Sequence, residues 1–415
     1  METNEALIQA SQTATAAAML SQQTIKETLQ AISEAIIEHT PFIIEANQAD
    51  LARMDCSNPK YDRLLLTPAR IEAIANDMLA VAALATPVGE ILSETERPNG
   101  MQIIKMAVPL GVVGVIYEAR PNVTLDIFSL CLRTNNVCVL KGGSDADATN
   151  QAIVHIIQQQ LERLNLPKAL CTLLKADRAA TAAMLKAVGL VDVINPRGSN
   201  ALIQYVRGNA LVPVIETGAG VCHTYIDVEA DIQKAQAVVT NAKTRRVSVC
   251  NALDCVLIHE QRLADLPTIC ELLATHNVLI YADSAAYDLL KATYPAELLL
   301  HADAESFGTE FLDYKMSIRT VSNLTQALQH IAQHSSKHSE SILTENATTA
   351  NQFELAVDAS CVYTNVSTAF TDGGQFGFGA EVGISTQKLH ARGPMGLDAL
   401  TTYKYLIRGN GQTRI

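Results

Sequence analysis

The sequence is short of positive charge. Its 415 residues include 31 Lys and Arg against 43 Asp and Glu, a formal net charge of −12 at pH 7. Proteins hold nucleic acids and anionic membrane surfaces largely by neutralising phosphates with Lys and Arg, so this balance argues against both partners. Any phosphate that the chain binds must be met by local cations and donors. With 48% hydrophobic residues, a disordered or fibrous chain is also excluded.

Long hydrophobic runs are missing too. The longest spans about ten residues around VPLGVVGVIY, where a membrane-spanning helix needs about 20. The start, METNEALIQA, carries an acid where a secretory signal has Lys or Arg. The nine cysteines are odd in number, scattered, and partly within apolar runs such as NVCVL. We therefore expect a cytoplasmic protein with reduced thiols.

Most of the chain alternates short apolar runs with longer helix-periodic segments. Residues 4–54 and a stretch to about 84 have helical spacing, and from 111 the segments GVVGVIYEA, NVCVLKGG, VDVIN and LVPVIETG alternate with helical ones. A second series begins near 231. This length and pattern predict two α/β domains with parallel sheets wrapped by helices.

Two further segments predict a different element. Residues 91–108 contain a Pro-Asn-Gly turn between two alternating arms, which predicts a β-hairpin. The C-terminal TTYKYLIRGNGQTRI is β-prone but too short to fold alone. We expect it to pair with its own hairpin or with a neighbouring subunit.

The first candidate for chemistry is Cys250, in NAKTRRVSVCNALDC. It follows Lys243, Arg245 and Arg246, and nearby cations raise the thiolate fraction of a cysteine. A nucleophilic role is one interpretation. A small core residue at a strand entrance is the other.

Two polar residues lie at predicted strand ends, where open α/β sheets gather ligands. Glu216, in VIETGAG, ends an apolar strand, although an exposed turn acid is the commoner meaning of this pattern. Asn122, in YEARPNVTLD, could donate to a developing oxyanion or simply cap a helix.

The segment LKGGSDAD could hold a cofactor. Lys141 ends a strand, and the helix that follows two glycines has an N-terminus that favours an anion such as a phosphate. A plain strand-to-helix turn fits equally well. The sequence has no GxGxxG and no Walker motif, so motifs alone do not indicate a dinucleotide site.

Three histidines recur at a spacing of four: His330, His334 and His338. On one helical face they could suggest zinc. However, the intervening SSK ends a helix, and no Cys or carboxylate pair accompanies them. We expect a solvated helix end and no metal site.

Taken together, these segments resemble the gamma-glutamyl phosphate reductases, a phosphate-using branch of the aldehyde dehydrogenase superfamily. The resemblance covers nearly the whole chain. The motifs that carry it are VPLGVVGVIYEARPNVTLD, VLKGG, VIETGAGVCHTYID, NAKTRR with VCNALD, HSESILTEN, TDGGQFGFGAEVGISTQKLHARGPMGL and TTYKYLIRGNGQ.

The resemblance implies an aldehyde dehydrogenase-like α/β fold with two Rossmann-type domains and an oligomerisation hairpin. The cofactor-binding domain would span 1–90 and 109–230, with 387–400 returning to it. The catalytic domain would span 231–386. The hairpin and tail would be 91–108 and 401–415.

The resemblance also implies a reaction. Cys250 would attack gamma-glutamyl phosphate, phosphate would leave, and NADPH would reduce the thioester to glutamate 5-semialdehyde, the second step of proline biosynthesis. Asn122 and the Cys250 amide would form the oxyanion hole. Cys250 lies 34 residues after Glu216, the superfamily's spacing of nucleophile and acid. Since a water-activating base would waste the acyl phosphate, Glu216 receives no role beyond lining the site.

The cofactor expected from the resemblance is NADPH. NAD-using relatives have a Glu three residues after the lysine, where this chain has Ser144, and Lys141 would attract a 2′-phosphate. Ser199 matches the position that touches the pyrophosphate, and Glu310 matches the acid that holds the nicotinamide ribose. The chain departs from the superfamily's second glycine at Ile203.

A second departure is that Val247 stands where the family often has Pro. For the substrate's phosphate and carboxylate we expect Arg120, Arg245 and Arg246, although each could instead form a surface or interdomain ion pair. Lys388, His390 and Arg392, in TQKLHARGP, could serve the substrate in the same way, or could make structural hinge contacts.

The partners expected are further copies of the chain, with functional coupling to glutamate 5-kinase. Two alternatives stay open: an ordinary hydrolysing aldehyde dehydrogenase, which Glu216 would permit, and a catalytically idle partner or scaffold.

Overall fold

The structure is a computed structural model that describes residues 2–56, 58, 61–118 and 120–414. Contacts within the chain divide it into two compact units. The first unit comprises Met1–Thr217, Gly377–Gly383 and Met395–Ile415, and the second comprises Gly218–Phe376 and Ile384–Pro394.

The first unit begins with helices, as the apolar spacing over 4–54 predicts. Ile25, Leu29 and Ile36 lie on one buried stripe of α2, and Ser21 caps this helix by accepting a hydrogen bond from the Thr24 amide at 3.0 Å. The helices of this unit are α1 (Thr3–Ala18), α2 (Gln22–Glu38), α3 (Thr40–Leu51), α4 (Tyr61–Leu64), α5 (Pro68–Ala83), α6 (Asn122–Arg133), α7 (Asp147–Arg163), α8 (Arg178–Leu185) and α9 (Asn200–Asn209).

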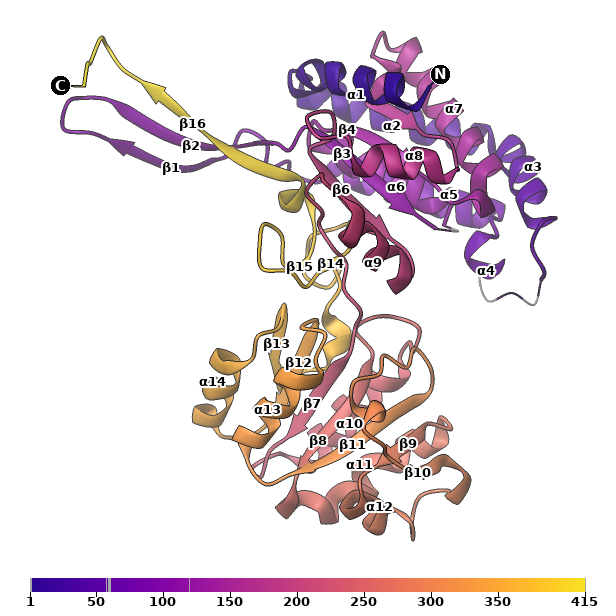
Figure 1. The fold of residues 1–415 in the computed structure, drawn as a ribbon, viewed down its shortest axis with the longest axis vertical. Coiled ribbons are helices and arrows are strands. Elements are labelled where there is room, and N and C mark those ends of the chain that lie inside the picture. Colours follow the sequence, from indigo (N-terminus) through magenta and orange to yellow (C-terminus); the bar gives the residue numbers. More distant parts are fainter. Residues whose placement is uncertain (1, 57, 59–60, 119, 415) are drawn as a thin grey trace. The chain divides into compact units, whose positions relative to one another are not determined.

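A four-stranded parallel sheet forms the core of the first unit, in the order β5-β4-β3-β6 (Figure 1). Its strands are β3 (Val112–Tyr117), β4 (Val137–Lys141), β5 (Cys171–Leu173) and β6 (Val193–Arg197). The chain runs outward from β3 to β5 and then returns to the other side of β3. The carboxyl ends of β3 and β6 therefore flank a topological switch point, the place where such sheets bind ligands.

The hairpin expected over 91–108 is present, as β1 (Ile91–Glu96) and β2 (Gln102–Pro109), paired antiparallel. The tail forms β16 (Thr401–Arg408), which pairs along β2 of its own chain. Of the two partners expected for the tail, the chain's own hairpin is thus the one seen. The three strands form a sheet of their own (Figure 1).

The second unit contains a seven-stranded parallel sheet, in the order β10-β9-β11-β8-β7-β12-β13. Its strands are β7 (Cys222–Ile226), β8 (Leu253–His259), β9 (Leu279–Ala282), β10 (Leu299–His301), β11 (Lys315–Val321), β12 (Ser339–Leu343) and β13 (Cys361–Thr364), with a small hairpin of β14 (Ile384–Ser385) and β15 (Gly393–Pro394). The predicted α/β class with parallel sheets is confirmed.

Helices pack on both faces of this sheet and give it two hydrophobic cores. Residues of α10, α11 and α12 form one core, and residues of α13 and α14 form the other. The helices are α10 (Ile232–Thr244), α11 (Leu266–Thr275), α12 (Ser284–Leu290), α13 (Leu324–His334) and α14 (Ala347–Ala356). Over the part of the chain that the structure describes, no helix is long and apolar enough to cross a membrane.

The division between the units falls elsewhere than the expected domain boundaries. It follows Thr217 rather than residue 230, because β7 pairs with β8 and β12 of the second unit. Residues 384–394 also stay with the second unit, since β14 pairs with β15, although we expected 387–400 to return to the first. The strand predicted over LVPVIETG is only a bridge between Ile194 and Val214.

Candidate active site

Cys250 lies in the turn between α10 and β8 of the second unit. All nine cysteines are thiols, and seven of them are buried; only Cys250, partly exposed, and Cys56, exposed, can meet a substrate. Burial of a thiol opposes ionisation, as in Cys222, whose pKa is raised well above its usual range by desolvation. Exposure therefore singles out Cys250 among the thiols of the second unit.

The backbone of the Cys250 turn is held by buried partners. The Cys222 thiol donates to the Cys250 carbonyl at 3.3 Å, and the Thr368 hydroxyl donates to the Asn251 carbonyl at 2.8 Å. A side chain at Gly220 would bring its Cβ to 1.7 Å from the Cys250 carbonyl oxygen, so only glycine fits there. The turn is thus fixed before any ligand arrives.

Glu310 belongs to the same region of the second unit. Its carboxylate accepts a hydrogen bond from the Gly220 amide at 2.8 Å. Gly220 in turn packs directly against the Cys250 backbone. Burial raises the pKa of this carboxyl. The structure therefore brings Glu310 and Cys250 together through Gly220, which the sequence analysis did not single out.

The basic residues before Cys250 separate into two kinds. Arg245 and Arg246 are exposed, as a ligand-binding role requires. Lys243, expected to act as a cation near the thiol, is instead fully buried and donates to the Leu253 carbonyl at 2.9 Å, with Asp254 at 3.7 Å. Its helical position turns it into the core, so its role is structural.

Asn122 is the first residue of α6, beyond the carboxyl end of β3. Its side-chain amide donates to the Asp126 carboxylate at 2.9 Å, which orients it and leaves its second hydrogen for a ligand. Burial raises the pKa of Asp126 to about 6. Sequence reasoning missed Asp126, although a carboxylate four residues on in a helix is the signal that could have found it.

At the N-terminus of α7, the structure favours the plain strand-to-helix turn, one of the two interpretations of LKGGSDAD. Asp50, fully buried, accepts from the amides of Ala148 and Thr149 at 3.1 and 2.8 Å and from the Thr149 hydroxyl at 2.6 Å. The favoured anion at this helix end is therefore the chain's own carboxylate.

Lys141 and Ser144 lie in a mixed environment of cations and carboxylates. Lys141 ends β4, and Ser144, exposed, begins the next turn. Arg53 donates to the Ser144 carbonyl at 3.3 Å and is itself largely exposed. Burial lowers the pKa of Lys141, whereas nearby carboxylates counteract this. The sequence analysis had not linked Arg53, 91 residues earlier, to this turn.

Ser199 caps α9 at the carboxyl end of β6, on the other side of the switch point from Asn122. Its amide and its hydroxyl donate to the Glu118 carboxylate at 3.0 and 3.3 Å. Asp50 at the N-terminus of α7 is fully buried, whereas Glu118 is only partly buried, so an incoming anion can displace Glu118 from these donors. Glu118 had not been identified from the sequence.

Glu216 lies beside Arg207 of α9, with the guanidinium Nε 3.5 Å from the carboxylate. Arg120 is exposed, and its carbonyl accepts from the Val123 amide at the start of α6. Both residues belong to the first unit.

Two basic residues in 387–392 have structural partners. Lys388 and Arg392 pair with Asp358 at 3.0 and 2.7 Å, together with Lys337 at 3.0 Å. Both residues thus make structural contacts, as the second of their two interpretations predicts. The three cations keep the pKa of Asp358 well below its usual range.

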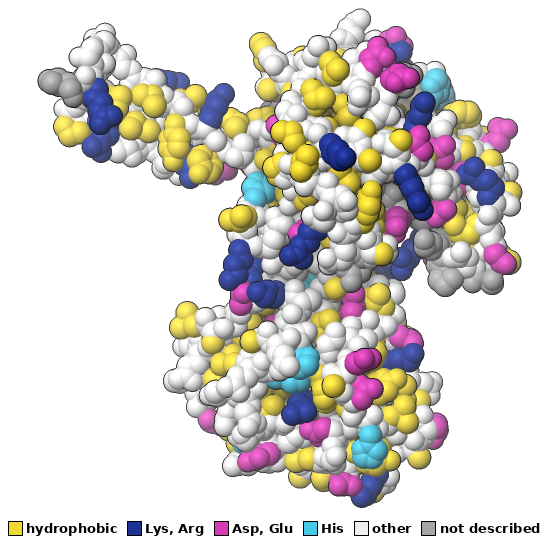
Figure 2. Space-filling model, in the orientation of Figure 1, with side chains coloured by type: hydrophobic (Ala, Val, Ile, Leu, Met, Phe, Trp, Pro, Cys, Tyr) yellow, Lys and Arg dark blue, Asp and Glu magenta, His cyan; other side chains and the backbone are white. Residues whose placement is uncertain are grey.

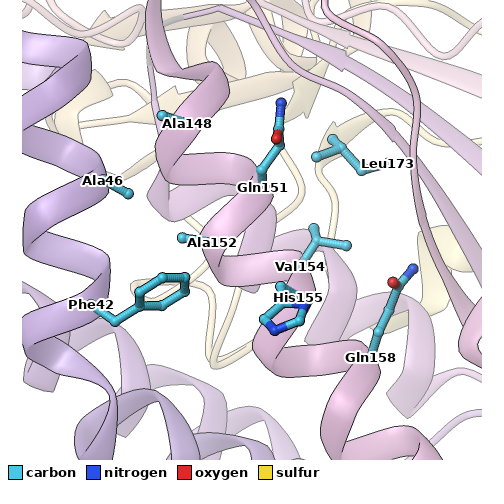
Figure 3. Close-up of a pocket in the computed structure, with 9 residues that line it drawn as sticks. All are labelled: Phe42, Ala46, Ala148, Gln151, Ala152, Val154, His155, Gln158 and Leu173. Atoms are coloured by element: carbon cyan, nitrogen blue, oxygen red, sulfur yellow. The ribbon is translucent and has the colours of Figure 1, made fainter.

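A groove of about 610 Å³ lies between α3 and α7 (Figure 3). Phe42 from α3 faces His155 of α7, with ring centroids 6.4 Å apart, and Gln151 and Gln158 line the same side. None of the site residues predicted from the sequence lines it.

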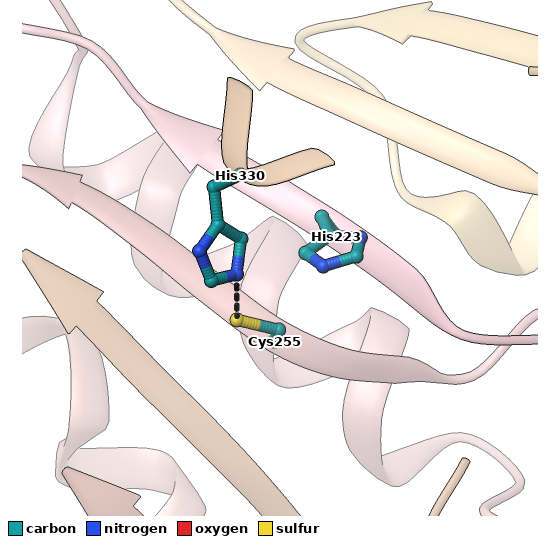
Figure 4. Close-up of side chains that lie close together, drawn as sticks. All are labelled: His223, Cys255 and His330. Carbon is teal, nitrogen blue, oxygen red and sulfur yellow. Dashed lines mark hydrogen bonds between the residues drawn. The ribbon is translucent and has the colours of Figure 1, made fainter. Parts of the chain in front are cut away.

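The histidine series is arranged differently from the expectation. His330 and His334 share one face of α13, with ring centroids 4.5 Å apart, but the helix ends there and His338 is buried before β12. The expected solvated helix end is therefore wrong for His338, and also for His330, which lies against Cys255 and His223 (Figure 4). The sequence could not show this, because Cys255 and His223 come from two earlier strands.

The sequence profile of the aldehyde dehydrogenase family matches residues 2–276. The fold agrees, with two α/β units and a thiol on a fixed turn. The chain belongs to the aldehyde dehydrogenase family, and it is an oxidoreductase.

Closer relatives define the branch. Gamma-glutamyl phosphate reductase of Parabacteroides distasonis is 61% identical over 415 residues, 100% of both chains. That of Bacteroides thetaiotaomicron is 60% identical over 397 residues, 96% of this chain and 95% of the relative. The crystal structure of gamma-glutamyl phosphate reductase from Thermotoga maritima matches with a TM-score of 0.96 at 38% identity, over 100% of both chains. The resemblance predicted from the sequence is confirmed, and the chain groups with the gamma-glutamyl phosphate reductases.

Proposed function

We propose that this chain reduces gamma-L-glutamyl 5-phosphate with NADPH to L-glutamate 5-semialdehyde and phosphate, the second step of proline biosynthesis from glutamate. The observation that carries the proposal is the partly exposed Cys250 on a turn with a fixed backbone, in a chain that matches relatives of that name over its full length. The first unit would then be the cofactor-binding domain and the second the catalytic domain.

The proposed chemistry begins at Cys250. Its thiolate attacks the acyl carbon, the carbon–oxygen bond to phosphate breaks, and a thioester forms as phosphate leaves. NADPH, when bound, supplies the hydride that reduces the thioester, and the thiolate departs as the aldehyde forms. The Cys250 amide and the free hydrogen of the Asn122 amide are proposed to stabilise the oxyanion; one such donor is worth about 3 to 4 kcal/mol.

Glu216 is proposed to line the site without activating water. In hydrolytic relatives a residue at this spacing acts as the base. Here its carboxylate forms an ion pair with Arg207. The ion pair occupies the carboxylate, which supports a site where no water is activated and the thioester lasts until it is reduced. A hydrolysing enzyme is the alternative, and it would turn over aldehyde without phosphate.

The residues of the first unit fit a phosphorylated dinucleotide. The donors of Ser199 already hold a carboxylate, and a pyrophosphate would take the place of Glu118. Ser144 brings no negative charge toward a 2′-phosphate, and Lys141 and Arg53 lie at the same turn. We therefore propose NADPH rather than NADH. Glu310 is proposed to hold the nicotinamide ribose.

For the substrate, Arg245 and Arg246 are exposed on the segment that leads to Cys250, and Arg120 is exposed in the first unit. Guanidinium groups bind phosphate and carboxylate through paired hydrogen bonds. We propose these three arginines as ligands of the two anionic ends of the substrate.

The three-stranded sheet is proposed to bind a second copy of the chain. Hydrophobic side chains lie exposed along it between Lys and Arg (Figure 2), and Tyr403, Tyr405 and Ile407 of β16 are 50%, 56% and 63% exposed. Exposed apolar groups of this kind mark interaction surfaces. We also propose functional coupling to glutamate 5-kinase, which would supply the labile acyl phosphate. The proposed location is the cytoplasm.

The reverse reaction tests the function. With pyrroline-5-carboxylate as aldehyde source, NADP⁺ reduction should require phosphate or arsenate, and Cys250→Ala should abolish it. Cys56→Ala removes the other accessible thiol and should leave the rate unchanged. Equal rates with and without phosphate would contradict the proposal in favour of a hydrolysing enzyme, and an active Cys250→Ala would contradict the assignment of the nucleophile.

A further inference from the structure

Three side chains with metal-ligating atoms converge on one face of the sheet in the second unit (Figure 4). They are His223 of β7, Cys255 of β8 and His330 of α13, and their ligand atoms all lie within 4.8 Å of one another. His223 and Cys255 are register partners on adjacent parallel strands, and His330 reaches them from the covering helix.

The hydrogen bonds of His223 show which nitrogen is available. Glu340 accepts from the His223 amide at 2.9 Å, from the Ser335 hydroxyl, and from His223 Nδ1 at 3.1 Å. An ionised carboxylate can only accept hydrogen bonds, and we therefore assign the proton of this contact to Nδ1. A carboxylate on the remote nitrogen is the arrangement that orients metal-binding histidines.

The opposite nitrogen, His223 Nε2, is left without any hydrogen-bond partner among the residues that the structure describes, although the side chain is fully buried. Buried polar atoms are normally paired, so an orphaned acceptor calls for an explanation. Nδ1 is occupied by Glu340, and so Nε2 is the atom that His223 offers to the cluster with Cys255 and His330.

We propose that His223 Nε2, Cys255 Sγ and His330 Nε2 bind a soft divalent metal ion of the zinc type. On binding, the Cys255 S–H bond breaks, its proton passes to solvent, and a metal–sulfur bond forms with no change of oxidation state. The Cys255 Sγ and His330 Nε2 atoms are 3.8 Å apart, close to the about 3.5 Å that tetrahedral zinc bonds to sulfur and nitrogen give.

The surrounding charges suit a buried dication. The Cys255 thiolate and the Glu340 carboxylate together offset two positive charges, and a thiolate with imidazoles selects zinc over magnesium or calcium. Arg319, held over the Phe307 ring at 5.2 Å, is a nearby positive charge that opposes binding. The partly exposed His330 and His334 provide a route of entry from solvent.

This metal site is separate from the proposed nucleophile. Cys222, which holds the Cys250 carbonyl, is the register partner of Leu253. His223 is instead the partner of Cys255, and the register shifts between these two pairs. Leu253 belongs to the core formed with α10, α11 and α12. Cys255 belongs to the core formed with α13 and α14. A bound ion would tie α13 to β7 and β8, and its role would be structural.

The test uses the full chain carrying Cys250→Ala, which removes the catalytic thiol as a competing ligand. After stripping with a chelator under reducing conditions, it is titrated with Co²⁺ and then Zn²⁺. We expect about one equivalent of Co²⁺ to give a thiolate-to-cobalt charge-transfer band and tetrahedral d–d bands, and Zn²⁺ to remove both.

Variants in the same background assign the ligands. Cys255→Ser should abolish the charge-transfer band, and His330→Gln should weaken Zn²⁺ binding at least about tenfold. Glu340→Gln, which touches no metal, should weaken it about 10- to 100-fold. Cys270→Ser, a buried thiol in the other core, and His301→Gln, an exposed histidine, are matched controls that should bind as before.

Three results would overturn the proposal: no band in the Cys250→Ala protein, a band that persists after Cys255→Ser, or equal losses in the Cys270→Ser control. His330 is only half-buried, so His330→Gln tests the site should the Cys255 variant fail to fold. In that case, the proposal would be contradicted if His330→Gln bound Zn²⁺ as tightly as the Cys250→Ala protein and if Zn²⁺ raised the melting temperature of both proteins equally. Because the background lacks the catalytic thiol, these outcomes are independent of the proposed reaction.

Discussion

The two units hold their candidate functional residues in different ways. In the second unit, the backbone of the Cys250 turn is fixed by the buried Cys222 and Thr368 and by the close approach of Gly220. In the first unit, Asn122 and Ser199 lie at strand ends, and each is bonded to a carboxylate of the same unit. The difference indicates a fixed backbone at the proposed nucleophile in one unit and, at Ser199 in the other, donors that are occupied by a partly exposed side chain.

The largest effect is expected at Asn122. If its amide donates to the oxyanion, Asn122→Ala should lower kcat about 10²- to 10³-fold with a smaller change in KM. Asn209→Ala, an exposed amide on α9, serves as the control and should keep the wild-type rate. A loss confined to KM would instead assign Asn122 to ground-state binding.

The second unit should also be sensitive to acid, because His338 is buried next to Cys222, with Nδ1 3.9 Å from the thiol. Burial lowers the pKa of His338 from its ordinary value near 6.5 to about 4. Between these values the unfolded chain binds more protons, so the free energy of unfolding falls as pH falls, by up to about 3 kcal/mol.

Urea unfolding at a series of pH values between 7 and 4 measures this slope. His338→Asn should reduce this slope, whatever its effect on stability at pH 7, and the half-buried His330, whose pKa burial lowers in the same way, should keep a part of it. The exposed His276→Asn should leave the slope unchanged. A slope in His338→Asn equal to that of the wild type would contradict the contribution of His338.

The fixed turn can be disturbed without touching the thiol. Gly220→Ala would place a methyl group against the Cys250 carbonyl and displace the backbone, and misplacement of a reacting group by about 1 Å can cost about 10²-fold in rate. Gly208→Ala, with no atom within 4 Å of the new Cβ, is the control. Equal activity of the two variants would contradict the importance of the fixed turn.

The smallest effect concerns cofactor choice in the first unit. Ser144→Glu should raise the KM for NADPH about tenfold and favour NADH, because a carboxylate would repel the 2′-phosphate. Ser284→Glu, at the exposed start of α12, adds the same charge elsewhere. An unchanged NADPH to NADH ratio in Ser144→Glu would remove Ser144 from the cofactor site.

The sequence predicted those features that depend on neighbours in the chain. The strand that ends at Lys141, the strand-to-helix junction at Asn122 and the hairpin over 91–108 follow from local patterns, and the structure has each of them. For Cys250 the local pattern left two interpretations open, a reactive thiol and a core residue, and the structure shows a partly exposed thiol. The family resemblance added the chemistry, since no local pattern distinguishes Ser144 or Glu310 from other polar residues.

What the sequence could not predict depends on contacts between distant segments. Asp50 fills the N-terminus of α7 from almost 100 residues away, and Glu118 reaches Ser199 across the switch point. The sequence predicts Lys243 to be a cation near the thiol, but its side chain is buried against Asp254. The cluster around His223 likewise exists only after two strands and a helix have packed together.

The central claim is that Cys250 carries an acyl group that only phosphate or hydride removes. Rapid mixing of the enzyme with NADP⁺ and pyrroline-5-carboxylate, without phosphate, measures it directly. The account predicts a burst of about one NADPH per chain, then no turnover until phosphate is added, and a glutamyl adduct on the peptide that contains Cys250. Continuous NADPH formation without phosphate, or a burst with no adduct at Cys250, would contradict it.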